Sequence, residues 1–274
     1  HCGRFELSLE RPLVMGIGNV TPDSFSDGAR YFSTDRAIGH ALELLDQGAD
    51  ILDIGGESTR PGAAAVDTTE ELQRLMPVIE GLRDCGVPVS VDTCKPEVMR
   101  AVLDAGVDMI NDIDGFRAPG AIDAVAASGC GLCVMHMQGE PRTMQTHPIY
   151  EDVIADIREF LRARAQALRT QGVAPGRIVL DPGFGFGKTL AHNYRLLGGL
   201  SDVRVDEYPL LVGVSRKSMI GGVTGRPADQ RLGGSIAAAL AGLARGAEIV
   251  RVHDVADTVD AIKVWTAIEQ GVRA

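Results

Sequence analysis

Aromatic side chains are scarce in this chain, whose 274 residues include seven phenylalanines, four tyrosines and one tryptophan. Apolar residues nevertheless make up 45% of the chain, so its core must be mainly alanine, valine, leucine and isoleucine. Aliphatic cores of that kind are typical of parallel strands covered by helices. The length is enough for one large α/β domain or two small ones.

Basic charge, long apolar runs and a cysteine framework are also missing. A net charge of −10 and a pI near 5.1 argue against a nucleic-acid or anionic-membrane surface. No apolar run approaches membrane-spanning length, and the amino terminus, which begins at His1 rather than Met, shows no signal-peptide pattern. The five cysteines have no framework spacing, which indicates a reducing compartment. We therefore expect a cytoplasmic protein with no nucleic-acid or membrane partner.

Two nucleotide-binding fingerprints are absent as well. The motif G-x-G-x-x-G occurs nowhere, which argues against a doubly wound open sheet. Gly187-Lys188-Thr189 ends like a P-loop, but Pro182 stands where that motif needs its first glycine. We therefore exclude a P-loop.

The sequence does contain eight unbroken aliphatic runs, each followed by a helical pattern. They are Leu13–Ile17, Ile51–Ile54, Val87–Val91, Met109–Ile113, Leu132–Met135, Ile178–Leu180, Leu210–Val214 and Ile249–Val252. Strict alternation without a linker predicts an α/β fold with one (β/α)8 TIM barrel, a single domain over residues 1–274. The alternating segment Phe5–Leu9 predicts a short N-terminal β extension across the amino end of the barrel.

Helices are expected between these runs. Six of them have both ends predicted, about Ser33 to Gly48, Pro96 to Gly106, Pro119 to Gly129, Tyr150 to Gln171, Pro227 to Gly246 and Ala256 to Gln270. Another begins with a capping box of Thr68 and Glu71 and is expected to kink at Pro77. One more begins after Lys188. The small residues of Gly233–Gly242 allow either a subunit contact or tight packing on the barrel. Glycine and proline in loops 18–32 and 55–67 fit lids that order on binding and are mobile without ligand.

Polar side chains stand just past the end of each aliphatic run. They are Asn19; Asp53 with Glu57; Asp92; Asn111 with Asp112; His136; Asp181; Arg216 with Lys217; and Arg251 with His253. Because such barrels carry their active site at the carboxyl ends of the strands, we predict that these residues form one site.

The chemistry of this set divides by charge. Acceptors suited to a flat heterocycle with an amide and an amino group come from Asp92, Asn111 and Asp181. Donors suited to phosphate come from Lys217, Arg251, His253 and Asn19. The glycine-rich loop after Asp181 also carries Phe184 and Phe186, which we expect to wall a pocket.

The combined motifs resemble the dihydropteroate synthase family, from about residue 13 to residue 265. They are Gly18-Asn-Val-Thr-Pro-Asp-Ser-Phe-Ser-Asp-Gly28, Asp53-Ile-Gly-Gly-Glu-Ser-Thr-Arg-Pro61, Val91-Asp-Thr93, Ile110-Asn-Asp-Ile113, Asp181–Lys188, Ser215-Arg-Lys-Ser218 and Arg251-Val-His253. The resemblance implies a (β/α)8 enzyme of folate biosynthesis, usually homodimeric. Such an enzyme joins 4-aminobenzoate to 6-hydroxymethyl-7,8-dihydropterin diphosphate, releases pyrophosphate with Mg²⁺ present, and is inhibited competitively by sulfonamides.

The resemblance also implies roles for individual residues. The pterin would be held by Asp92, Asn111, Met135, Asp181, Gly213 and Lys217. The diphosphate would meet Asn19, Thr59, Arg251 and His253, and Mg²⁺ would meet Asn19. The aminobenzoate would lie among Phe25, Thr59, Arg60, Pro61, Phe186 and Ser218. Catalysis would depend on Asp92, Asp181, Lys217 and Arg251.

The chemistry expected of these residues is dissociative. The carbon beside an electron-rich pterin ring can bear positive charge, so the C–O bond can break before the arylamine arrives. Asp92 and Asp181 would favour that cation, while Mg²⁺ and Arg251 stabilise the leaving diphosphate. Two bound substrates need positioning more than activation, and no general base is required.

Other interpretations stay open from the sequence. Cys130-Gly-Leu-Cys133 has redox or zinc spacing, although buried inert thiols are expected there. Lys217 could form a Schiff base, as in an aldolase. A pterin-binding methyltransferase with a corrinoid partner should lack the Thr59–Pro61 and Ser215–Ser218 segments. A paralogue without turnover should have damaged lids.

Overall fold

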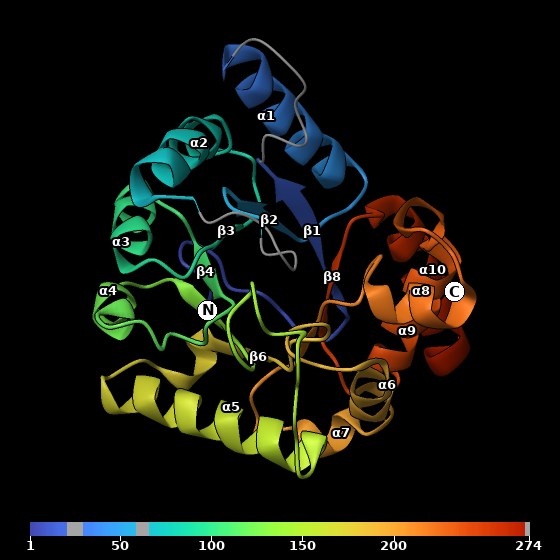
Figure 1. Cartoon of the computed structure of the whole chain (residues 1–274). Helices are drawn as coiled ribbons and strands as arrows, with labels where there is room; N and C mark the ends of the chain where they lie inside the picture. The colour runs from blue at the N-terminus through green and yellow to red at the C-terminus, as the bar shows by residue number, and fades with distance from the viewer. Residues whose placement is uncertain (21–29, 59–65, 272–274) are drawn as a thin grey trace.

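Eight parallel strands surround a common axis, and helices cover the outside of the barrel that they form (Figure 1). The computed structural model describes residues 1–20, 30–58 and 66–271. The strands are β1 (Leu13–Asn19), β2 (Ile51–Gly55), β3 (Val89–Asp92), β4 (Met109–Asp112), β5 (Gly131–Met135), β6 (Ile178–Asp181), β7 (Leu211–Val212) and β8 (Ile249–Val252). β1 pairs with β8, and the bridge between Leu180 and Leu210 joins β6 to β7. The predicted (β/α)8 barrel is confirmed, with every aliphatic run in a strand.

The helices follow the strands in the expected order. They are α1 (Arg30–Asp46), α2 (Thr68–Gly81), α3 (Pro96–Asp104), α4 (Ala121–Ala126), α5 (Val153–Thr170), α6 (Leu190–Gly198), α7 (Leu200–Val203), α8 (Ser218–Thr224), α9 (Leu232–Leu243) and α10 (Val255–Gln270). The prediction missed α7 and α8, which are too short to show a helical period, and began α9 too early, because a 3₁₀ turn (Ala228–Gln230) precedes it. Within the described part of the chain, no helix combines the length and apolarity needed to cross a membrane.

The start of α2 differs from the prediction. Asp67 is the N-cap, and its side chain accepts a hydrogen bond from the backbone N–H of Glu70 at 2.8 Å. Glu71 cannot complete a capping box with Thr68, because its carboxylate is buried in an ion pair with Lys95. Pro77 lies inside α2, which continues past it to Gly81.

Side chains alternate between the inside and the outside of the barrel along each strand. The inward side chains form an apolar half at the amino end and a polar half at the carboxyl end. Toward the amino ends the inward positions are apolar and form one buried cluster, with Leu13, Met15, Ile51, Met109, Cys133, Val179, Leu211 and Ile249. Two residues further along β2, β4, β6 and β8, the same face carries Asp53, Asn111, Asp181 and Arg251. The strand period therefore brings polar groups together at the carboxyl end, above an apolar floor.

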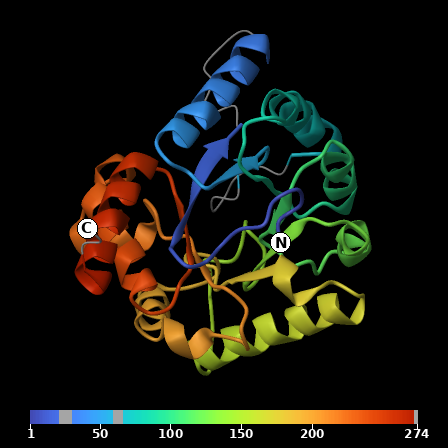
Figure 2. The same ribbon diagram turned by 180° about the vertical axis from the view of Figure 1, so that it is seen from behind.

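The first eleven residues lie across the amino end of the barrel, as predicted (Figure 2). Cys2 is buried, and both Cys2 and Leu7 pack on the apolar floor. The predicted strand is wrong, however, because within the described ranges Phe5–Leu9 pairs with no strand and the segment makes a single antiparallel bridge, between Cys2 and Phe5. Arg4 fastens the segment instead, donating from Nε and Nη2 to the two carboxylate oxygens of buried Asp108, both at 2.9 Å.

Two sequence patterns with more than one interpretation have structural roles. Cys130 packs outside the barrel and Cys133 inside it, and burial raises the pKa of both thiols, which disfavours redox or zinc chemistry.

In α9, a Cβ built on Gly242 would lie 3.4 Å from Val212 of β7, and one on Gly234 would lie 2.4 Å from Ile220 of α8. These glycines allow α9 to pack closely within its own chain.

Arg4→Ala should lower the free energy of unfolding by about 1–2 kcal/mol, because it removes two hydrogen bonds from a buried carboxylate. Arg11→Ala is the matched control. Its ion pair with Asp50 is more exposed (63% and 14%, against 46% and 1% for Arg4 and Asp108), so about 0–1 kcal/mol is expected. Urea unfolding measures both, and equal losses would contradict the anchoring role of Arg4.

Candidate functional site

A charged network crosses the carboxyl end of the barrel. Arg251 of β8 donates from Nε to Asp53 Oδ2 at 2.6 Å and from Nη2 to Asp92 Oδ2 at 3.1 Å. Asp53 is fully buried and also accepts from Ser90 Oγ at 2.6 Å and from Asn111 Nδ2 at 3.1 Å. Four strands are thereby held in one arrangement by side chains at their inward positions.

The network leaves two buried acceptors unused. Among the residues that the structure describes, Asp92 Oδ1 and Asn111 Oδ1 have no hydrogen-bond partner, although both side chains are buried. Burial raises the pKa of Asp92 to about 7, against the opposing effect of Arg251. Because an unpaired buried acceptor is costly, these oxygens indicate a site for a ligand that presents hydrogen-bond donors.

Asp181 and Lys217 lie on the other side of the site. Asp181 Oδ1 accepts from the backbone N–H of Gly183 at 2.7 Å, and burial raises the pKa of its carboxyl despite Lys217. Lys217 Nζ donates to the carbonyl of Phe184 and lies 4.7 Å from the centre of the Phe186 ring. Burial lowers the pKa of Lys217 to about 8.

Smaller residues shape the space between these groups. A Cβ built on Gly213 would lie 3.8 Å from Arg251 Cβ and 3.9 Å from Lys217 Nζ. Met135 is buried in a small cluster with Ile113, and Phe186 packs against it. The predicted role of Phe184 as a pocket wall is wrong, because its side chain is fully buried in the core between barrel and helices.

The predicted phosphate-binding residues are only partly described. Asn19 ends β1, and a Cβ on Gly55 would lie 3.2 Å from its Oδ1, so the glycine gives this side chain room. His253 Nδ1 and its backbone N–H lie 3.1 and 3.2 Å from Ser215 Oγ. Ser218 is exposed at the start of α8. Phe25, Thr59, Arg60 and Pro61 fall outside the described residues, as do most of the two predicted lids.

Four residues predicted for the site are held by partners outside the charged network, although Glu57 still lines the cavity beside Asp92. Glu57 pairs with Lys95, and Asp112 accepts from two backbone N–H groups of its own turn, of Asp114 and Phe116, each at 2.7 Å. Arg216 pairs with Asp254, at a backbone φ of 58° that reverses the direction of the chain.

His136 is the fourth. It lies beneath the glycine-rich loop, with its ring edge-on to Phe160 at 4.8 Å and its Nδ1 2.9 Å from Lys188 Nζ. Burial, reinforced by the charge of Lys188, lowers the pKa of His136 to about 2.

Asp53 was predicted at a strand end but without a role in the site. The strand period indicates that Asp53 faces inward, because Ile51 and Asp53 share one face of β2 and Ile51 belongs to the apolar floor. Ser90 lies within β3, and Ser215 was recognised only as part of the Ser215–Ser218 motif. Their bonds to Asp53 and His253 were missed because nothing in the sequence shows these partners.

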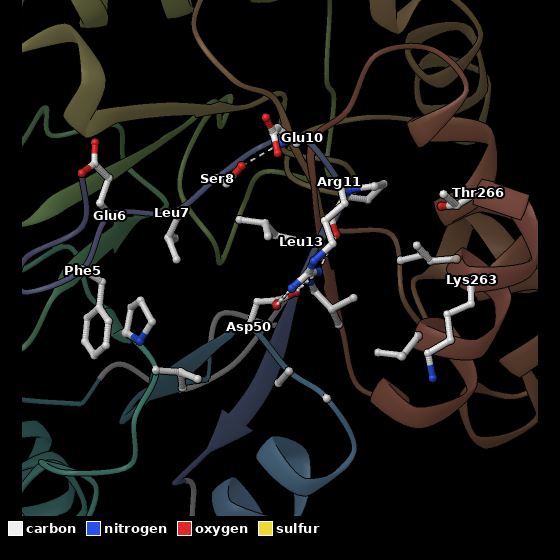
Figure 3. Close-up of a pocket in the computed structure, with 18 of the residues that line it drawn as sticks. Phe5, Glu6, Leu7, Ser8, Glu10, Arg11, Leu13, Asp50, Lys263 and Thr266 are labelled. Atoms are coloured by element: carbon white, nitrogen blue, oxygen red, sulfur yellow. Dashed lines mark hydrogen bonds and ion pairs between the residues drawn. The ribbon is translucent and has the colours of Figure 1, made fainter. Parts of the chain in front are cut away.

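Cavities occur at both ends of the barrel. One of about 410 Å³ borders Asp92 at the carboxyl end. Another, of about 1250 Å³, lies at the amino end between the N-terminal segment and α10, where Arg11 reaches Asp50 and faces Lys263 and Thr266 (Figure 3). The unused acceptors and the charged network lie at the carboxyl end, so we assign the site there. No group of three or more His, Cys, Asp or Glu side chains that could hold a metal occurs among the residues described.

Comparison with known proteins agrees with this geometry. The family described as "Pterin binding enzyme" matches residues 15–253. Dihydropteroate synthase of Neisseria meningitidis serogroup C is 51% identical over 271 residues, covering 97% of this chain and 96% of that protein. The crystal structure of the Burkholderia cenocepacia dihydropteroate synthase complexed with 7,8-dihydropteroate superposes with a TM-score of 0.90 at 57% identity, covering 98% and 95% of the two chains. That of the Yersinia pestis enzyme with a sulfonamide drug gives 0.93 at 48% identity, covering 98% of each.

The buried neutral His136 predicts a stability that decreases in acid. Because the pKa of His136 is depressed in the folded chain, this imidazole is protonated in acid only when the chain unfolds. Its contribution to the free energy of unfolding is therefore complete above the ordinary pKa of 6.5 and falls as the pH decreases below that value. Between pH 7 and pH 5 this single group should remove about 2 kcal/mol from the free energy of unfolding. His136→Gln keeps an acceptor for Lys188 without titrating. Urea unfolding at both pH values should show a smaller loss for this variant, and equal losses would refute the prediction.

Proposed function

The chain belongs to the dihydropteroate synthase family of transferases, and from that premise we propose how its own site works. It joins 4-aminobenzoate to the methylene carbon of 6-hydroxymethyl-7,8-dihydropterin diphosphate and releases pyrophosphate, a step of folate biosynthesis. We further propose that residues 1–274 form a single pterin-binding domain.

One observation carries the pterin assignment, namely the unused buried acceptors on Asp92 and Asn111. A reduced pterin presents ring N–H and amino donors along one edge, and it would satisfy both acceptors together with Asp181. Lys217 would meet an acceptor of the ring, while Met135 and Gly213 leave a flat space beside it. The product 7,8-dihydropteroate, bound by the Burkholderia relative, contains this ring.

The diphosphate belongs with the donors at the other edge of the site. Arg251, His253, Asn19 and Thr59 would hold it, with Arg251 already oriented by its two carboxylates. The described residues form no carboxylate cage for a metal, and a site with one amide oxygen, from Asn19, fits an ion carried largely by the substrate phosphates, as is usual for Mg²⁺. When bound, Mg²⁺ would neutralise charge on the leaving diphosphate.

The aminobenzoate subsite lies beside the glycine-rich loop in this proposal. Phe186 and Ser218 would line it, completed by Phe25, Thr59, Arg60 and Pro61. Sulfonamides resemble 4-aminobenzoate in shape and would compete for the same space, consistent with the sulfonamide complex of the Yersinia relative.

The charges of the site favour dissociative chemistry. As the C–O bond breaks, positive charge develops on the methylene carbon and ring, and the carboxylates of Asp92 and Asp181 stabilise it. Arg251 stabilises the negative charge that develops on the leaving group. The arylamine then attacks and loses its proton to solvent, so beyond this electrostatic stabilisation the residues act by positioning the reactants.

Two further points belong to the same proposal. All five cysteines are free thiols, in keeping with a reducing cytoplasm. We also propose a homodimer, as is usual in the family, which sedimentation equilibrium would test.

Formation of 7,8-dihydropteroate should require both 4-aminobenzoate and the parent site. Asp181→Asn keeps size but turns one acceptor into a donor that faces a donor, at a cost of about 1–3 kcal/mol in pterin binding. Loss of cation stabilisation should lower turnover on the order of a hundredfold. The melting temperature should change by less than about 3 °C, because the carboxylate serves the ligand rather than the core.

Asp123→Asn, at an exposed position of α4, is the control and should behave as the parent. Parent enzyme without turnover on these substrates would refute the proposed reaction. Turnover and pterin affinity of Asp181→Asn within about twofold of the parent would refute the site assignment.

A second prediction concerns pH. The pKa of Lys217 near 8 means that its ammonium is lost as the pH rises through that value. kcat/KM, which reports the free enzyme, should then fall about tenfold per pH unit. Lys217→Arg stays charged, so its profile should lack this alkaline limb whatever its absolute rate. A limb that persists unchanged in the variant would assign the titration to another group.

A further inference from the structure

Lys188 is a buried lysine with no substrate role in the function proposed above. Its side chain is 3% exposed, and its Nζ lies 2.8 Å from the carbonyl of Gly183, 3.0 Å from that of Phe186 and 2.9 Å from His136 Nδ1. These three contacts surround the nitrogen, so none of its hydrogen-bonding capacity is left for a phosphate. Among the described residues no carboxylate forms an ion pair with Lys188, and burial lowers the pKa of its side chain well below the ordinary value.

The turn that Lys188 holds is highly constrained. Gly183 and Gly187 have φ of +71° and +62°, and a Cβ would come within 1.9 Å of the His136 carbonyl and 2.4 Å of the Gln138 carbonyl. On the far side, Asn193 accepts from the N–H of Gly185 at 2.7 Å. The backbone is therefore fixed from both sides, and Lys188 is the only described side chain that binds two of its carbonyls.

The same turn places three groups of the site. The N–H of Gly183 holds the Asp181 carboxylate, the carbonyl of Phe184 accepts from Lys217, and the Phe186 ring lies against the Lys217 ammonium. Two lysines thus bind one turn, Lys188 through the carbonyls of residues 183 and 186 and Lys217 through that of residue 184. Releasing the carbonyl of Phe186 would free its ring to move.

We propose that Lys188 is a positioning residue for the transferase reaction, which holds the 183–186 turn so that the Phe186 ring forms a fixed wall of the aminobenzoate subsite beside Lys217. It touches no substrate and acts through Phe186. The inference rests on the proposed function only for the identity of the amine substrate. Lys188 binds the carbonyls of residues 183 and 186, whereas the two pterin residues that this turn places, Asp181 and Lys217, are held through the N–H of Gly183 and the carbonyl of Phe184. Asp92 and Asn111 would hold the pterin from other strands, so the amine substrate should be affected more than the pterin.

Lys188→Met removes the charge and the donors while keeping the length of the side chain. The KM for 4-aminobenzoate should rise about tenfold, while that for the dihydropterin diphosphate stays within about threefold. Lys263→Met, on the exposed face of α10, is the matched control and should change neither. In a Phe186→Leu background, adding Lys188→Met should raise the aminobenzoate KM by less than about twofold, because residues in one chain of contacts are not additive.

Fluorine NMR separates this inference from the proposed function. With 4-fluorophenylalanine incorporated and Phe186 assigned by Phe186→Leu, its resonance should shift or broaden in Lys188→Met and stay unchanged in Lys263→Met, with no substrate present. An unchanged resonance, or full additivity of Lys188→Met and Phe186→Leu in the aminobenzoate KM, overturns the inference.

Asn193→Ala covers the case in which Lys188→Met does not fold. It releases the N–H of Gly185 from the other side of the turn and should give the same selective rise in the aminobenzoate KM. An equal rise for both substrates in that variant would overturn the inference. Absence of turnover in the parent with a shifted resonance would refute the proposed function alone.

Discussion

The guanidinium of Arg251 is the contact on which the arrangement of the site depends. It bridges Asp53 and Asp92, and Asp53 in turn holds Ser90 and Asn111. Buried ion pairs contribute little net stability, because desolvation offsets their attraction. Their consequence here is orientation, since both oxygens of Asp53 are engaged while Asp92 and Asn111 each keep one free acceptor. The network that balances the buried charge therefore also leaves the edge that a ligand can bind.

The glycine-rich turn complements this network from β6. Its backbone supplies the N–H that holds Asp181 and the carbonyl that holds Lys217. A turn that binds through its backbone must come close to its neighbours, which excludes a Cβ at Gly183. The site thus combines a side-chain half, made by β2, β3, β4 and β8, with a backbone half, made by the loop after β6.

Stability and function are separated along the barrel axis. The apolar inward residues at the amino end form a floor that the N-terminal segment covers, anchored by Arg4 on Asp108. The polar inward residues at the carboxyl end rest on this floor, where little water can replace a missing partner. This separation explains why a cavity of about 1250 Å³ at the amino end is not the site, since none of the unused acceptors lies there.

Much of this could be predicted from the sequence, because alternation of aliphatic runs and helices is a local pattern. It determined eight strands, the barrel, and a ring of polar residues at the strand ends that includes Asp92, Asn111, Asp181 and Arg251. It failed at Phe5–Leu9, where alternation of apolar and polar residues resembles a strand but, among the described residues, the segment forms only a bridge between Cys2 and Phe5.

Only the tertiary structure decided which strand-end side chains face the site. A residue just past a strand takes its direction from the loop backbone and from partners far away in the chain. The positive φ of Arg216 and its pairing with Asp254 direct it away from the barrel. His136 lies beneath the glycine-rich loop with its Nδ1 against Lys188, a lysine whose neighbours resemble the P-loop that the sequence excludes. Sequence by itself determined where polar groups collect, and the folded chain determined which of them remain unpaired, because hydrogen-bond partners 37 to 198 residues apart meet only in the closed barrel.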